Sequence, residues 1–156
     1  DLDAVITWRR QQADLGRRLV VTNGCFDLLH RGHVDYLNKA REQGDALLVL
    51  INSDASIRRV KGPGRPVICE ADRVYMLASL ACVDAVLIFG TKHCTSQFAK
   101  IVPDVYVKGG DYTEETLVQE EYRLLKSQGC AFAFIPFVDG LSTTELLRRI
   151  RASVEG

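Results

Sequence analysis

The sequence has no apolar stretch long enough to cross a membrane and no excess of either charge. Its uninterrupted apolar runs are far shorter than the ~20 residues that a membrane-spanning helix needs. Twenty basic residues balance twenty acidic ones, so the whole chain has no field that would attract nucleic acid or an anionic membrane. Neither kind of partner is expected, and any site for an anion must be local.

Paired cysteines and flexible linkers are also missing. The five cysteines, at 25, 69, 82, 94 and 130, are odd in number and form no C-x-x-C pair, which argues against a zinc site. The acidic start lacks the basic and apolar regions of a signal peptide, and reduced thiols in the cytoplasm are the simplest interpretation. Without repeats or a linker rich in Ser, Gly or Pro, residues 1–156 are expected to form a single domain, with 1–16 as a helical lead-in.

Short apolar runs alternate with amphipathic stretches along the chain. The apolar runs predict strands at 18–23, 46–51, 85–89, 105–108 and 131–136, and the amphipathic stretches predict helices at 33–43, 70–81, 95–101, 116–127 and 142–151. Strands that are nearly continuous in apolar residues and alternate with helices indicate a parallel sheet covered on both faces. The prediction is an α/β fold with one doubly wound, Rossmann-like, five-stranded sheet, in which ligands bind beyond the carboxyl ends of the strands.

The first predicted strand leads directly into two histidines three residues apart. It ends in Thr22-Asn23-Gly24-Cys25-Phe26-Asp27, and the next helix opens at His30-Arg31-Gly32-His33. Free backbone N–H groups and the helix dipole favour an anion at such a position, and an imidazole beside phosphate becomes a better cation. Gly24 and Gly32 carry no Cβ and would let the main chain approach a phosphate. An isolated H-x-G-H is more often an ordinary helix start, but its place after a strand favours a phosphate site.

A basic segment follows the second predicted strand. It begins at Asn52-Ser53-Asp54 and contains Arg58, Arg59, Lys61 and Arg65 around Gly62-Pro63-Gly64. We expect a glycine-rich loop whose long cationic side chains cover a triphosphate. The alternative is a solvated basic loop, and the segment taken alone favours that alternative.

Two further segments are predicted to reach the same end of the sheet. The fourth strand continues into Lys108-Gly109-Gly110-Asp111-Tyr112, which suits close approach to a ligand or an ordinary tight turn. In Ser142-Thr143-Thr144-Glu145, the first and last residues match a capping box, while the two threonine hydroxyls are free to suit a phosphate. Neither a Walker A string nor a G-x-G-x-x-G is present, so P-loop and dinucleotide fingerprints do not apply.

Taken together, residues 22–33 resemble the signature of the cytidylyltransferase-like nucleotidyltransferase superfamily, whose mark is H-x-G-H. Residues 142–144 resemble its second nucleotide-binding motif. Within the superfamily the chain is most similar to the adenylyltransferases of ADP-heptose synthesis, in stretches at 52–56, 61–62, 65–67, 83–84, 107–112 and 139–144. Ala81 and Phe137 stand where glycerol-phosphate and choline-phosphate cytidylyltransferases carry arginine, which favours ATP over CTP.

The resemblance implies transfer of AMP from ATP to a sugar 1-phosphate, D-glycero-β-D-manno-heptose 1-phosphate, giving ADP-heptose and pyrophosphate for lipopolysaccharide core synthesis. It implies catalytic roles for His30, His33 and Lys61. It implies nucleotide binding by Thr22, Asn23, Gly24, Cys25, Phe26, Gly32, Arg73, Lys108, Gly109, Gly110, Asp111, Ser142, Thr143 and Thr144. Acceptor binding would fall to Asp27, Asn52, Asp54 and Arg65. Magnesium would be carried by the triphosphate, with no metal cage of protein side chains.

The resemblance also implies a homodimer and a sugar kinase, either as a partner or as a fused domain. Three alternatives remain open. One is a cytidylyltransferase for glycerol 3-phosphate or another small phosphate, and another is a nucleotide-binding module without turnover. The third, a class I aminoacyl-tRNA synthetase fragment, shares H-x-G-H but is disfavoured because the sequence has no K-M-S-K-S string.

Overall fold

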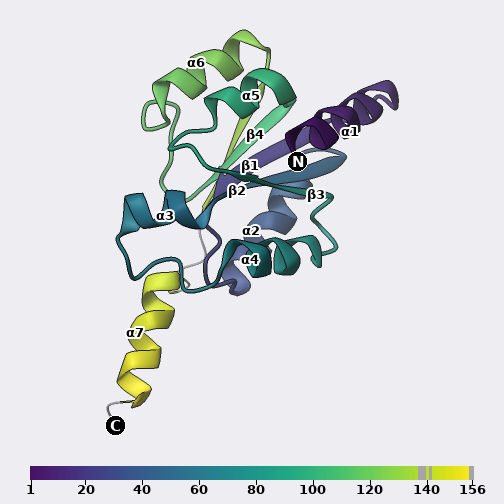
Figure 1. Cartoon of the computed structure of the whole chain (residues 1–156). Coiled ribbons are helices and arrows are strands. Elements are labelled where there is room, and N and C mark those ends of the chain that lie inside the picture. The colour runs from purple at the N-terminus through teal and green to yellow at the C-terminus, as the bar shows by residue number, and fades with distance from the viewer. Residues whose placement is uncertain (137–139, 141, 155–156) are drawn as a thin grey trace.

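Five parallel strands form one sheet in the computed structural model, which describes residues 1–136, 140 and 142–154. The strands are β1 (Leu19–Gly24), β2 (Ala46–Asn52), β3 (Ala85–Phe89), β4 (Val105–Gly109) and β5 (Ala131–Ile135), in the order β3-β2-β1-β4-β5 (Figure 1). Every pairing is parallel. The predicted fold class is therefore confirmed, whereas Phe137 and Asp139 lie outside the described residues.

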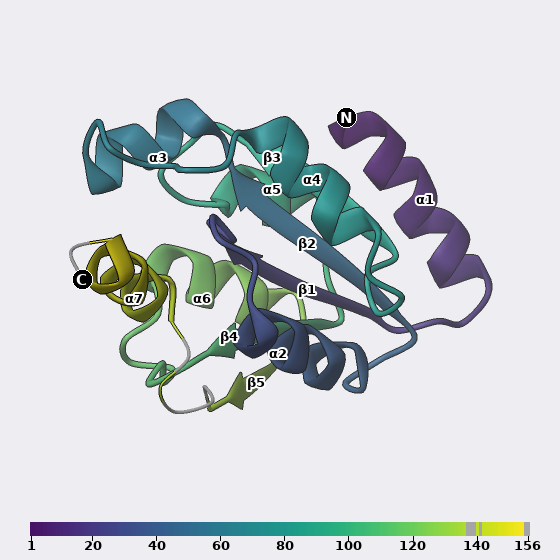
Figure 2. The ribbon, with the colours of Figure 1, turned by 90° about the horizontal axis from the view of Figure 1, so that it is seen from below.

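Helices cover both faces of this sheet. They are α1 (Leu2–Asp14), α2 (Arg31–Arg41), α3 (Asp54–Lys61), α4 (Glu70–Ala78), α5 (Thr95–Ile101), α6 (Gln119–Ser127) and α7 (Thr143–Val154). One apolar cluster packs α1, α5 and α6 against one face, and a second packs α2 and α4 against the other. Figure 2 shows α3 and α7 at the end of the sheet where the strands finish.

The central strands are buried on both sides, which explains their continuous apolar sequence. In β1, Leu19 and Val21 belong to the first cluster, while Val20 between them belongs to the second. In β2, Leu48 and Leu50 alternate in the same way with Leu47, Val49 and Ile51. Successive side chains of a strand point to opposite faces, so both clusters depend on the same two strands.

The segment after β2 is a helix, and the predicted loop is wrong over residues 54–61. The Ser53 hydroxyl accepts the Ser56 N–H at 3.2 Å and caps α3, and Asp54 lies in the first turn. Arg58, Arg59 and Lys61 fall in the last turn, where cations complement the helix dipole. The helix has only eight residues, fewer than the roughly 11–18 over which helical periodicity is read from a sequence. Because this segment is helical, Lys61 is held at the end of a helix.

Arg73 of α4 ties the ends of β1 and β2 together. Its side chain is 0% exposed, and it donates to the main-chain oxygens of Cys25 at 2.6 Å and Asn52 at 2.8 Å. It also bonds the Ile68 oxygen and forms an ion pair with Asp54 at 2.8 Å. The guanidinium lies inside the scaffold and does not line the cavity described below. Arg73 is therefore part of the scaffold, and its contact with a nucleotide stays a prediction.

We expect Arg73→Ala to lower the free energy of unfolding by about 3–5 kcal/mol, because it leaves buried carbonyls and the Asp54 carboxylate without their partner. Urea unfolding of the purified chain measures this loss. The control is Arg123→Ala, at an exposed position of α6, which should change the same quantity by no more than about 0.5 kcal/mol. Equal losses in the two variants would contradict the role assigned to Arg73.

Candidate active site

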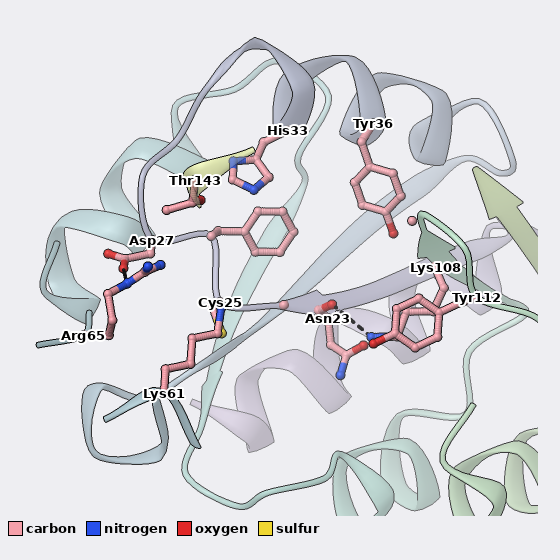
Figure 3. Close-up of a pocket in the computed structure, with 13 residues that line it drawn as sticks. Asn23, Cys25, Asp27, His33, Tyr36, Lys61, Arg65, Lys108, Tyr112 and Thr143 are labelled. Atoms are coloured by element: carbon pink, nitrogen blue, oxygen red, sulfur yellow. Dashed lines mark hydrogen bonds and ion pairs between the residues drawn. The ribbon is translucent and has the colours of Figure 1, made fainter. Parts of the chain in front are cut away.

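A cavity of about 340 Å³ opens at the carboxyl ends of β1 and β4. These neighbouring strands mark the point where the strand order reverses, and doubly wound sheets bind their ligands there. Figure 3 shows Asp27 and Arg65 facing each other on one side and Asn23, Lys108 and Tyr112 grouped on the other, with His33 and Lys61 between them. The lining residues are Asn23, Gly24, Cys25, Phe26, Asp27, His33, Tyr36, Lys61, Arg65, Lys108, Gly109, Tyr112 and Thr143.

The two histidines stack on each other at the start of α2. Their ring centroids are 3.9 Å apart with an interplanar angle of 21°. His33 lines the cavity, and His30, which precedes the first helical residue, packs against its ring. Within the described part of the chain, Nδ1 of each ring lacks a hydrogen-bond partner of ordinary geometry. Both of these nitrogens are buried, so their unused hydrogen-bonding capacity is not exposed on the cavity surface.

Burial keeps both imidazoles uncharged at neutral pH. It lowers the pKa of His33 to about 4, with smaller lowering contributions from His30 and Lys61 and an opposing one from the main chain of Leu28. Burial also lowers the pKa of His30. A phosphate beside these rings would favour the protonated form and raise both pKa values. The positive charge of the pair would thus develop when an anion arrives.

The turn after β1 depends on the absence of a side chain at position 24. Phe26 has a positive φ of 47°, an uncommon conformation for a residue with a side chain. A Cβ on Gly24 would lie 2.9 Å from Cε2 of the Phe26 ring. That ring in turn contacts His33, with centroids 5.2 Å apart. Gly24 is therefore required for packing as well as for any approach of the main chain to a phosphate.

Lys61 and Arg65 bring cations to the cavity in different ways. The Lys61 ammonium is exposed and has no hydrogen bond or ion pair with any residue that the structure describes. Arg65 forms an ion pair with Asp27 through Nε and Oδ2 at 2.5 Å. The buried Asp27 also accepts the main-chain N–H groups of Val67 and Ile68, at 2.8 and 2.9 Å. Asp27 thus organises residues 65–68, while Lys61 is available to a ligand.

Lys108 supplies a third cation from the end of β4. Its Nζ donates to the Asn23 oxygen at 3.4 Å and lies 5.0 Å from the centre of the Tyr112 ring. Burial lowers the pKa of Lys108, and the nearby Glu121 carboxylate acts in the opposite direction. The Asn23 side chain is held in place because its Oδ1 accepts the Tyr106 hydroxyl at 2.8 Å.

The cavity includes many of the predicted site residues and leaves others outside. Thr22 is fully buried, and its hydroxyl bonds the Tyr36 hydroxyl at 2.6 Å, so we assign it to the core. Asn52 bonds Ser56, and Asp54 pairs with Arg73. Ser142 caps α7 by accepting the Glu145 N–H at 3.1 Å, while the Glu145 carboxylate pairs with Arg148 and Arg149. The other predicted residues outside the cavity lining are His30, Gly32, Gly110, Asp111 and Thr144.

Two tyrosines of the lining were not predicted as site residues. Tyr36 lies three residues after His33 on α2, and this spacing places both on one side of the helix. Its hydroxyl also donates to the Val107 oxygen at 3.1 Å, which links α2 to β4. Tyr112 ends the segment with the paired glycines that follows β4. The helical spacing was the signal that could have identified Tyr36.

Neither a metal cluster nor a membrane span is found in the part of the chain that the structure describes. Those residues contain no group of three or more His, Cys, Asp or Glu side chains that could hold a metal ion. None of the described helices is long and apolar enough to span a membrane.

A doubly wound sheet with paired histidines and three cations at its reversal point suits the binding of an anionic nucleotide. Residues 21–149 match the cytidylyltransferase-like family, and the chain belongs to that family. The resemblance inferred from the motifs is thereby confirmed.

Two curated relatives agree with this assignment. The bifunctional protein HldE of Geotalea uraniireducens is 50% identical over 151 residues, which are 97% of this chain and 30% of that protein. HldE of Syntrophotalea carbinolica is 51% identical over 86% of this chain and 27% of that protein. The chain therefore spans less than a third of these relatives.

Two solved structures share the fold. The lipopolysaccharide core biosynthesis protein of Thermoplasma volcanium is 26% identical, with a TM-score of 0.64 over 79% of this chain and 98% of that one. TmcAL of Thermotoga maritima is 14% identical, with a TM-score of 0.61 over 88% of this chain and 51% of that one, which is a likeness of fold alone.

The depressed pKa of His33 predicts a pH dependence of stability. A histidine whose folded pKa of about 4 lies below the ordinary 6.5 takes up its proton more readily in the unfolded chain. Its stabilising contribution is therefore complete above pH 6.5 and is lost as the pH falls toward 4. Between these limits, the wild type should lose about 2–3 kcal/mol more unfolding free energy than His33→Asn, as measured by urea unfolding. Parallel pH profiles for the two proteins would contradict the buried, neutral state.

Proposed function

We propose that the chain is an adenylyltransferase domain that transfers AMP from ATP to D-glycero-β-D-manno-heptose 1-phosphate. The products are ADP-heptose and pyrophosphate, for synthesis of the lipopolysaccharide core. The observation that carries the proposal is the stacked His30–His33 pair beside a cavity that Lys61 and Lys108 also line. The substrate assignment is supported by the motif resemblance, by the relatives named HldE and by the Thermoplasma volcanium protein named for lipopolysaccharide core biosynthesis.

In the proposed reaction, a phosphate oxygen of the sugar 1-phosphate attacks the α-phosphorus of ATP in line. A bond forms between that oxygen and the α-phosphorus, and the bond from the α-phosphorus to the α–β bridging oxygen breaks. Pyrophosphate leaves with the bonding electron pair. The attacking oxygen is already anionic, so no general base and no covalent enzyme intermediate are needed. The protein contributes positioning and charge stabilisation.

The cavity contains groups suited to these tasks. We assign His33, with His30 stacked on it, to the phosphates at the start of α2, where backbone N–H groups also point. Lys61 would neutralise charge on the transferring phosphoryl group from the end of α3. Magnesium, which prefers phosphate oxygens and water, would travel with the triphosphate and add positive charge there.

The remaining walls would hold the rest of the two substrates. The main chain at Gly24–Phe26 and Gly109, together with the Thr143 hydroxyl, lies on the cavity and would contact the nucleotide. Of the four predicted acceptor residues, Asp27 and Arg65 line the cavity. Their ion pair uses Nε of Arg65, which leaves its two terminal nitrogens for a phosphate group.

The chain corresponds to only part of each relative, and this guides our proposal about the proteins or domains that act with it. The HldE proteins are named bifunctional, and the chain matches less than a third of the Geotalea and Syntrophotalea proteins. We propose that a sugar kinase, fused or separate, supplies the 1-phosphate. A homodimer in the cytoplasm, with residues 1–156 forming one domain, is part of the same proposal, and the five free cysteines fit a reducing compartment.

A pyrophosphate-release assay tests the reaction directly. With magnesium present, ATP and CTP are each paired with heptose 1-phosphate, other sugar 1-phosphates and glycerol 3-phosphate. We expect the highest kcat/KM for ATP with the heptose, and His33→Ala should lower the rate about 10²–10³-fold because it removes a group from the transition-state site. Asn38→Ala, at an exposed position of the same helix, is the control and should retain full activity.

Each other outcome of this assay selects a different function. A preference for CTP would indicate a cytidylyltransferase. Nucleotide binding without pyrophosphate release over the whole panel would indicate a binding module. Equal rates for His33→Ala and the wild type would remove His33 from the mechanism.

A further inference from the structure

A second cavity, of about 170 Å³, lies beside the first. Asn23, Lys108 and Tyr112 line both cavities, so the two meet at these side chains. The other lining residues come from the segment after β3, from β4 and from the region of α6: Lys92, His93, Tyr106, Leu117, Val118 and Glu121. The roles proposed above for the nucleotide and for phosphoryl transfer use none of these six side chains.

The lining of this second cavity includes a buried carboxylate, that of Glu121. The residue is 4% exposed, and burial raises the pKa of its carboxyl group. One carboxylate oxygen accepts the main-chain N–H of Cys94, which joins α6 to the start of α5. The other oxygen has no hydrogen bond or ion pair with any described residue. A buried carboxylate is costly unless its oxygens are bonded, so this oxygen is a candidate acceptor for a ligand.

Donor side chains line the same cavity as this carboxylate, and none of those described forms an ion pair with it. Lys108 and Glu121 line the same cavity, and each shifts the pKa of the other, yet no ion pair joins them among the described residues. The hydrogen bond from Lys108 to the Asn23 oxygen is long, at 3.4 Å, and leaves two N–H groups of the ammonium for a ligand. The His93 ring adds a further polar group to the lining of this cavity. The cavity therefore combines one strong acceptor with several donors.

We propose that this second cavity holds the sugar ring of the acceptor, with Glu121 accepting hydrogen bonds from ring hydroxyls and Lys108 and His93 facing other hydroxyls. The proposal rests on the function proposed above, because the sugar must lie next to the phosphate that attacks in the first cavity. The shared side chains Asn23, Lys108 and Tyr112 make the two cavities direct neighbours, as this arrangement of the acceptor requires.

Chemistry and size favour a sugar over the nucleotide base in this cavity. Each sugar hydroxyl is both a donor and an acceptor, so a sugar can satisfy the carboxylate and the ammonium together. A flat base would leave part of this polar set unbonded, and an unsatisfied buried polar group is expensive. The cavity is also smaller than the ~300–1,000 Å³ of typical sites for whole drug-sized ligands, which suits one ring.

The test is Glu121→Gln, assayed by pyrophosphate release with ATP and heptose 1-phosphate. Glutamine keeps the size, and its carbonyl oxygen can still accept the Cys94 N–H, but the charge is lost and one acceptor becomes a donor. We expect the KM for heptose 1-phosphate to rise about 10- to 100-fold while the KM for ATP stays at its wild-type value. Glu120→Gln removes the same charge from an exposed position one residue away on α6, and both KM values should be unchanged.

The outcomes separate this proposal from the function on which it rests. Wild-type protein without turnover on the acceptor panel contradicts the proposed function before any variant is compared. If the wild type is active, an unchanged KM for the sugar in folded Glu121→Gln overturns the sugar site. A rise confined to the KM for ATP also overturns it and assigns the second cavity to the nucleotide.

A second variant covers the case in which Glu121→Gln does not fold, as judged by circular dichroism. His93→Ala removes a half-buried ring whose nitrogens bond none of the described residues, so it should leave the fold intact. We expect about a 3- to 10-fold rise in the KM for heptose 1-phosphate and no change for ATP. Wild-type values for both substrates would overturn the assignment.

Discussion

The buried guanidinium of Arg73 holds together the backbone from which the site is built. It bonds main-chain oxygens at the ends of β1 and β2, the Ile68 oxygen and the carboxylate at the start of α3. A planar cation with several fixed donors can satisfy these acceptors together, which a single ammonium cannot. Arg73 thereby ties the turn after β1, which leads to His33, to the start of α3, which ends at Lys61. The buried charge of Arg73, which does not line the cavity, therefore helps to position His33 and Lys61, which do.

Asp27 organises the main chain in a similar way, but with a negative charge. It is buried at the end of the β1 turn and gathers two main-chain N–H groups and the Arg65 side chain. Together, Arg73 and Asp27 add internal ionic contacts to the packing of Phe26 and Ile57 in the segments that follow β1 and β2. This explains how a chain with no net charge presents a cluster of cations at one end of its sheet.

The sequence was most informative where a residue's environment follows from its neighbours along the chain. The apolar runs of β1 and β2 predicted buried parallel strands, and the position of the histidines after β1 predicted their place at the sheet end. Local pattern did not reveal α3, because its eight residues are fewer than the roughly 11–18 over which helical periodicity is read. Nor could it distinguish Arg73, buried under distant carbonyls, from an exposed arginine such as Arg123. Glu121 was missed for the same reason, since its burial arises from contacts between α6 and the start of α5.

The close packing of Gly24, Phe26 and His33 has a consequence for how such sequences diverge. A side chain at position 24 would displace the aromatic ring at 26, which touches the imidazole at 33, itself stacked on the one at 30. A change at one of these four positions therefore alters the packing of the next. In related chains we expect them to vary together, with any larger residue at 24 accompanied by a smaller one at 26.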